Sequence, residues 1–130
     1  MFKNGVDENE IIARLRDEFL DDARLRLDLI RQARAATQSK DCENNPLQAF
    51  RAEVHTLKGT GQSFGFPSLT LISRRLEGYI RPFDEASFAA DTDVDSFIAA
   101  IADVIDAGEE PDDDALDALL DGLPEPAPQE

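Results

Sequence analysis

The spacing of apolar residues constrains the fold of this chain more than any other feature. From position 47 to 64 these residues recur at intervals of 3, 4, 3, 4 and 3, as Leu47, Phe50, Val54, Leu57, Gly61 and Phe64. Intervals of three and four place side chains on one face of an α-helix, whereas a half-buried strand requires alternation. The chain has no strand or hairpin pattern. The sequence therefore predicts an all-α fold.

Proline and glycine divide this pattern into four main helices. We expect these helices at about 7–39, 46–64, 69–81 and 92–107. Four helices joined by short loops favour an antiparallel four-helix bundle. Within the first stretch two apolar sets point in different directions, so we expect a short N-terminal helix joined to a long one. The alternative is a single helix that wraps around its core.

Charge is distributed unevenly along the 130 residues, which carry 13 Lys and Arg against 28 Asp and Glu, a net charge of -15. This charge disfavours nucleic acid and anionic membranes as partners. The chain has no apolar run long enough to span a bilayer and no signal peptide, so we expect a cytoplasmic protein. All 13 basic residues lie within 1–82, whereas 83–130 carries 16 acidic residues and no basic one.

This asymmetry suggests three segments. We expect the helical bundle at 1–108, an acidic short fifth helix within 109–121 and a flexible proline-rich tail at 122–130. The acidic segment either keeps the chain soluble, binds a basic partner or covers the surface around the single histidine.

That histidine, His55, is the first candidate for chemistry. It lies roughly 140 degrees from the centre of the apolar stripe, on the exposed face of its helix. Its helical neighbours are Arg51, Ala52, Lys58 and Gly59, with Gln62 two turns on. A glycine inside a helix costs roughly 1 kcal/mol, which indicates that something approaches the backbone there. Lys58 would favour an anion attached to the imidazole ring.

Counting residues across the helical hairpin adds a partner for the ring. If the turn is centred on Phe66, Glu77 faces His55 and Arg74 is level with Lys58. A carboxylate that accepts the proton of one ring nitrogen leaves the other nitrogen as a nucleophile. These residues suit a histidine that accepts and returns an anionic group such as phosphoryl. The alternative is a surface histidine beside a surface lysine with no function.

The stretch from His55 to Gly65, with Lys58 and Gly59 at plus 3 and plus 4 and the last glycine at plus 10, resembles the signature of histidine phosphotransfer (HPt) domains. Further matches resemble the phosphorylation-site domain of chemotaxis histidine kinases, loosely over 7–120. They are Phe50-Arg51-Ala52, Phe66 and Leu76-Glu77. One departure is Arg74, where that subgroup often has a second histidine.

The resemblance implies a role for each matching residue. His55 would carry the phosphoryl group, Lys58 would neutralise it and Glu77 would orient the ring. Gly59 would leave room for the partner's active site, whereas Gly61 and Gly65 would let the helices pack closely. Arg74 either assists the phosphoryl group or is solvated. Docking would use Arg51, Ala52, Lys58, Gly59 and Gln62 with the early part of the first helix.

We therefore expect a stoichiometric phosphocarrier of a two-component phosphorelay rather than an enzyme, since the chain has no nucleotide-binding motif. The partners would be response-regulator receiver domains, which supply the Mg²⁺ ion, and a histidine kinase. We expect no cofactor or metal of its own, no nucleic acid or membrane partner, and a monomer. Two alternatives stay open, namely the phosphoacceptor domain of a chemotaxis-type kinase and a helical interaction module that uses its acidic segment.

Overall fold

The computed structural model describes residues 8–39 and 45–125, and every regular element in these two ranges is helical. The prediction of an all-α fold is confirmed. The elements are α1 (Glu8–Gln38), α2 (Pro46–Gly61), a 3₁₀ turn (Gln62–Phe64), α3 (Pro67–Ile80), α4 (Glu85–Ala90), α5 (Val94–Ala107) and α6 (Asp113–Asp121).

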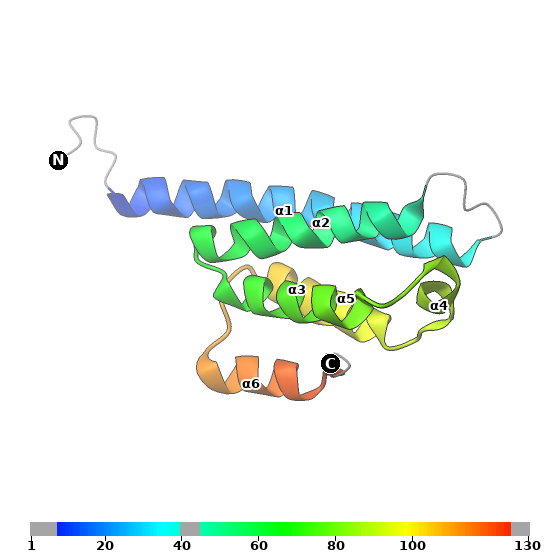
Figure 1. Ribbon diagram of the computed structural model, residues 1–130. Coiled ribbons are helices and arrows are strands. Elements are labelled where there is room, and N and C mark those ends of the chain that lie inside the picture. Colours follow the sequence, from blue (N-terminus) through cyan, green and yellow to red (C-terminus); the bar gives the residue numbers. More distant parts are fainter. Residues whose placement is uncertain (1–7, 40–44, 126–130) are drawn as a thin grey trace.

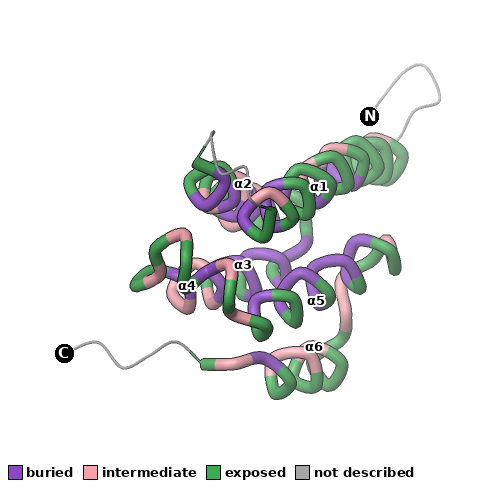
Figure 2. The backbone as a smooth tube through the Cα atoms, turned by 90° about the vertical axis from the view of Figure 1, so that its right-hand side faces the viewer, coloured by how far each residue is buried: buried purple, intermediate pink, exposed green. Residues whose placement is uncertain are grey.

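Four of these helices form an antiparallel bundle around one core. Helices α2 and α5 each pack against both α1 and α3, so the four helices form a closed ring of neighbours (Figure 1). Figure 2 shows that the buried stretches of α1, α2, α3 and α5 face one another. The core includes five of the six stripe residues of the second helix, the exception being Phe64.

Helix α1 differs from the expectation at its N-terminal end. It is one continuous helix of 31 residues, so the predicted short N-terminal helix is wrong and the continuous alternative holds. Ile12 and Leu15 remain 53% and 45% exposed. The reason is that the first turns of α1 extend past the end of α2, where no neighbouring helix covers them (Figure 1).

Helix α4 was not predicted, because six residues are too few to show a helical period. Its start is nevertheless encoded locally. The Asp84 carboxylate accepts a hydrogen bond from the Ser87 backbone N–H at 2.8 Å, and the Ser87 hydroxyl accepts one from the Asp84 backbone N–H at 3.0 Å. This reciprocal capping box begins the helix that connects α3 to α5.

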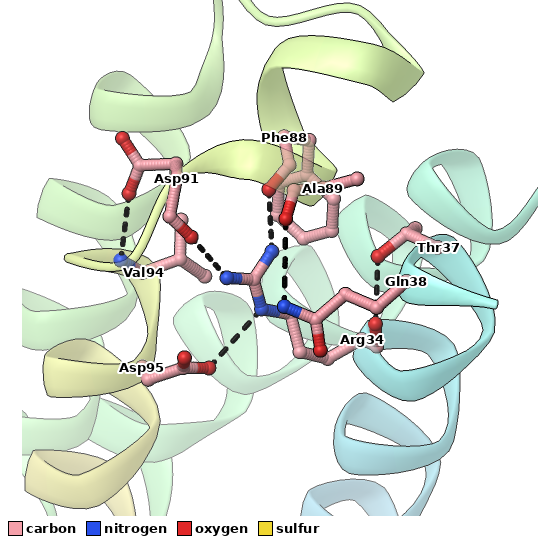
Figure 3. Close-up of polar contacts among 8 residues, drawn as sticks. All are labelled: Arg34, Thr37, Gln38, Phe88, Ala89, Asp91, Val94 and Asp95. Carbon is pink, nitrogen blue, oxygen red and sulfur yellow. Dashed lines mark hydrogen bonds and ion pairs between the residues drawn. The ribbon is translucent and has the colours of Figure 1, made fainter.

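A buried arginine on α1 holds that connection in place. The Arg34 guanidinium donates hydrogen bonds to the carbonyl oxygens of Phe88 and Asp91, and its Nε atom lies 3.1 Å from the Asp95 carboxylate (Figure 3). The guanidinium also lies 4.8 Å from the centre of the Phe88 ring. Its charge is thus paired and its donors are satisfied, as a 4% exposed arginine requires.

The acidic C-terminal segment packs on the side of α3 and α5 that faces away from α2 (Figure 1). Its expected fifth helix is α6, and Leu119 and Leu120 pack against the core. The Glu110 carboxylate accepts a hydrogen bond from the Ser68 backbone N–H at 3.0 Å, in the first turn of α3. An anion at this end of a helix is favourable because the helix dipole is positive there.

Residues 123–125, within the described part of the expected proline-rich tail, contact the rest of the fold. Leu123 is 7% exposed, and the Arg75 guanidinium donates to the carbonyl oxygens of Leu123 at 2.9 Å and Pro124 at 3.1 Å. Because three prolines lie within 122–130, the sequence does not reveal that Leu123 is buried or that Arg75 on α3 binds this segment. Residues 126–130 lie outside the described ranges, and the division into three segments stays a prediction.

Helices α2 and α3 approach each other closely at their hairpin because Gly61, the last residue of α2, has no side chain. The Phe66 backbone N–H donates to the Gly61 carbonyl oxygen at 2.8 Å. The Thr70 hydroxyl accepts from the Gln62 backbone N–H and donates to the Lys58 carbonyl oxygen, both at 2.9 Å. These bonds fix the first turn of α3 against the last turn of α2.

We predict that Gly61→Ala lowers the free energy of unfolding by about 1–3 kcal/mol, the usual cost of overpacking. The added Cβ atom would lie 2.9 Å from the Phe66 carbonyl oxygen and 3.0 Å from the Leu69 Cβ atom. Urea unfolding followed by circular dichroism measures the change. Gly59→Ala is the matched control, because its Cβ atom would meet nothing within 4 Å. A similar loss in both variants would contradict close packing at Gly61.

Candidate functional site

His55 lies on the solvent-facing side of α2, and its side chain is 70% exposed. The apolar stripe of α2 turns toward the core, which leaves the opposite face of the helix open. One turn further along this face, Gly59 has open space where a side chain would be. The packing of the chain therefore gives no reason for glycine at 59, and the backbone there is accessible to a partner.

Glu77 on α3 lies beside the ring, as the hairpin count predicts. Its Oε2 atom is 3.1 Å from His55 Nδ1, and its Oε1 atom is 2.7 Å from Lys58 Nζ. Partial burial alone would raise the pKa of the Glu77 carboxyl, but the hydrogen bonds from Lys58 and His55 outweigh it and lower the pKa below its ordinary value. Glu77 is therefore ionised at neutral pH.

An ionised carboxylate decides which ring nitrogen carries the proton. A carboxylate can only accept hydrogen bonds, so His55 Nδ1 must donate and the neutral ring is the Nδ1–H tautomer. The lone pair then lies on Nε2, on the other side of the ring from Nδ1. With the ring 70% exposed, the arrangement presents an oriented nucleophile to the solvent.

Lys58 is held by Glu77 rather than standing alone beside the ring. Its ammonium group and Nδ1 of His55 share the two oxygens of one carboxylate. The expected role of Lys58 in neutralising a phosphoryl group stays a prediction. In the state that the structure describes, Lys58 restrains the Glu77 carboxylate, and this contact was not predicted from the sequence.

The expected docking residues separate into two groups. Ala52 and Gly59 are exposed on α2, and Gln62 is exposed at the start of the 3₁₀ turn that follows it, so all three are accessible to a partner, and their role in docking stays a prediction. Arg51, in contrast, donates hydrogen bonds to the carbonyl oxygens of Ile80 at 2.8 Å and Phe83 at 3.0 Å. It therefore caps the C-terminal end of α3, where carbonyl groups lack partners within the helix.

An open hollow of about 530 Å³ lies beside His55, toward the C-terminal end of α3. Six side chains line it, namely Gln48, Arg51, Ala52, His55, Glu77 and Arg81. Gln48 and Arg81 were not predicted as site residues. The signal for Arg81 is its position four residues after Glu77, which places both on one face of α3. Arg74, three residues before Glu77, is exposed and does not line the hollow.

A second surface feature lies at the other end of α2. Phe64 is 40% exposed and its ring stacks on Phe19 at 5.1 Å between centroids. Phe64 and Leu15 line two smaller hollows of about 270 Å³ each, and Ile12 lines one of them. We call Ile12, Leu15 and Phe64 the apolar patch. It joins the 3₁₀ turn to the early part of α1, where the sequence predicts contacts with a partner.

Within residues 8–39 and 45–125, no three His, Cys, Asp or Glu side chains come together as ligands for a metal ion. None of the helices in these ranges combines the length and apolar character needed to cross a membrane. Helix α6 lies on the other side of α3 and α5 from α2, the helix that carries His55 (Figure 1), and the His55 side chain is 70% exposed.

Comparison with known proteins gives one match. The family model described as "Hpt domain" matches residues 14–123 of the 130. The matched segment contains His55, Glu77 and all four helices of the bundle apart from the first turns of α1. No curated protein matches the chain, and no solved structure does.

We predict that the neutral His55 ring is the Nδ1–H tautomer and that Glu77→Ala shifts it toward the Nε2–H form. The physical reason is that Glu77 is the acceptor that holds the proton on Nδ1. Long-range ¹H–¹⁵N correlation spectra of the ring distinguish the two forms. Glu53→Ala is the control, since Glu53 lies on another face of α2, where it pairs with Arg26 of α1. An unchanged tautomer in Glu77→Ala would contradict the orienting role.

Proposed function

The chain belongs to the Hpt domain family, and from this premise we propose that it is a phosphocarrier that exchanges a phosphoryl group between His55 and an aspartate of a receiver domain. Membership in the family implies histidine phosphotransfer in a phosphorelay. The observation that carries the proposal for this residue is the contact of His55 Nδ1 with Glu77 on an otherwise exposed ring.

The proposed transfer begins with in-line attack of His55 Nε2 on the phosphorus of the aspartyl phosphate. The bond between phosphorus and the carboxylate oxygen breaks as the nitrogen–phosphorus bond forms, and the aspartate leaves as a carboxylate. Nδ1 keeps its proton, and the Glu77 carboxylate stabilises the positive charge that the ring acquires. The reverse reaction passes the group onward.

The chain supplies the nucleophile, and the receiver supplies the other parts of the site. A Mg²⁺ ion and a lysine of the receiver would stabilise the oxygens of the transferring group. On the chain itself, Lys58 is the nearest cation to Glu77 and neutralises the phosphoryl group once it has arrived. This role requires the ammonium group to exchange a carboxylate oxygen for a phosphoryl oxygen.

Docking of the receiver would use the exposed face of α2 and the neighbouring end of α1. Ala52 and Gly59 are exposed on either side of His55, and Gly59 lets the partner approach the backbone. The apolar patch offers partly exposed apolar side chains next to this face. Apolar surface of this kind buries favourably in an interface, whereas the acidic α6 lies on the far side.

A second candidate is the phosphoacceptor domain of a chemotaxis-type histidine kinase, phosphorylated in trans. The observation in its favour is the Glu77–His55 pair, which a resemblance to that subgroup implies. Hpt domains interact with kinases and with response regulators in general. The two candidates differ in the donor, not in the residue that receives the phosphoryl group.

We predict that label passes from a phosphorylated receiver domain to the wild-type chain but not to His55→Gln. Radiolabel transfer from a panel of receivers, and from a kinase core with ATP, measures both candidates. Circular dichroism of His55→Gln verifies its fold, which an exposed side chain should not disturb. Label arriving only from the kinase would favour the second candidate. No label from any donor to a folded wild-type chain would refute both.

Gly59→Ala separates stability from transfer. We predict that it raises the free energy of unfolding by about 1 kcal/mol, because alanine is the better helix former. Transfer from the receiver is expected to slow by about tenfold or more, since each 1.4 kcal/mol of steric cost in the complex corresponds to a factor of ten. Labelling by phosphoramidate, a small donor that needs no docking, should stay unchanged. An unchanged rate with the receiver would argue against close approach at Gly59.

A further inference from the structure

Three cationic side chains near His55 differ in whether other groups of the chain already bind them. Lys58 Nζ lies 2.7 Å from Glu77 Oε1, and the Arg51 guanidinium is bonded to carbonyl oxygens at the end of α3. Arg81 is exposed, and among the described residues its side chain makes no hydrogen bond or ion pair. Of these three side chains, only Arg81 has all its N–H donors available for a new ligand.

Arg81 also faces the same space as His55. Both residues line the hollow of about 530 Å³, together with Glu77, which is one helical turn before Arg81 on α3. Antiparallel packing of α2 and α3 places Arg81 level with Arg51, one turn from His55 on the facing helix. An anionic group that enters the hollow beside the ring would therefore meet the guanidinium.

The charge of the chain makes such a contact valuable. A phosphoryl group adds up to two negative charges to a chain whose net charge is already -15. Glu77, the acidic residue nearest the ring, would repel the added group. A guanidinium offers paired N–H donors that match the geometry of phosphate oxygens, and it keeps its charge at every relevant pH.

We propose that Arg81 binds the phosphoryl group on His55 by donating hydrogen bonds to its oxygens from across the hollow. The inference rests on the proposed function in one respect, that His55 carries the group. Binding of the phosphoryl group is thereby assigned to an arginine at the C-terminal end of α3, whereas the candidates predicted from the sequence for this role were only Lys58 and Arg74. Arg81 would then bind the phosphoryl group together with Lys58, whose ammonium group contacts Glu77 in the unmodified chain.

The experiment uses phosphoramidate to label the full-length chain without any partner. His55 Nε2 attacks phosphorus, the nitrogen–phosphorus bond of the reagent breaks and ammonia leaves, while Nδ1 keeps its proton. The second ionisation of protein phosphoryl groups lies at about pH 6, so a ³¹P NMR titration follows it directly. A nearby guanidinium favours the dianion and lowers this pKa.

In Arg81→Gln we expect the phosphoryl pKa to rise by about one unit at low salt, and in Arg81→Lys to rise by less. Arg31→Gln replaces an exposed arginine on α1 that does not line the hollow; it removes the same charge and should leave the pKa unchanged. Lys58→Gln is measured in parallel. A rise in Lys58→Gln with none in Arg81→Gln would overturn the proposal.

The outcomes also distinguish this proposal from the function on which it rests. Label on His55 with an unchanged pKa in Arg81→Gln would refute the role of Arg81 and leave the phosphocarrier intact. Label that never appears on His55 of a folded chain would refute both. A pKa that depends on Arg81 would support the role of Arg81 whichever protein proves to be the natural donor.

Discussion

The contact between Gly61 and the first turn of α3 is the constraint on which the site depends. The Phe66 carbonyl oxygen and the Leu69 Cβ atom lie 2.9 and 3.0 Å from the position that a Cβ atom on residue 61 would occupy, so only glycine leaves room for them. This contact sets the register of the α2–α3 hairpin, and eleven residues to each side of Phe66 the register places Glu77 beside His55. A slip of one residue would turn the carboxylate by about 100 degrees and remove it from Nδ1.

The remainder of the chain secures this hairpin from the outside. Arg51 caps the far end of α3, and Glu110 accepts from the backbone at its near end. Arg75, on the face of α3 opposite Glu77, holds the carbonyl groups that follow α6. The acidic segment 109–125, which contains no basic residue, is thereby held on the side of α3 and α5 that faces away from α2, the helix that carries His55.

Much of this arrangement could be predicted from the sequence because it depends on local periods. The intervals of three and four predicted the helices of the bundle, and a count across one short turn was enough to pair His55 with Glu77. Contacts between distant segments could not be predicted in this way. Arg51 was predicted to be a docking residue because its carbonyl partners lie about 30 positions away in the sequence. Leu123 was assigned to the tail because prolines follow it. The continuity of α1 was only the alternative prediction because its uncovered turns carry apolar residues, which normally indicate a core.

The distribution of contacts around the ring explains how a small helical chain can serve a partner's chemistry under the proposed function. Among the described residues, the hydrogen bond that holds the unmodified ring is on its Nδ1 side, where the 23% exposed Glu77 carboxylate, itself bonded to Lys58, holds the proton. The Nε2 side faces solvent, and Gly59 extends the opening along the helix. A nucleophile whose own catalytic surroundings stood on the Nε2 side would obstruct the acidic site of a receiver. Glu77 therefore orients the ring from the Nδ1 side, and the Nε2 side stays open, for the same reason: the partner supplies the remaining catalytic groups.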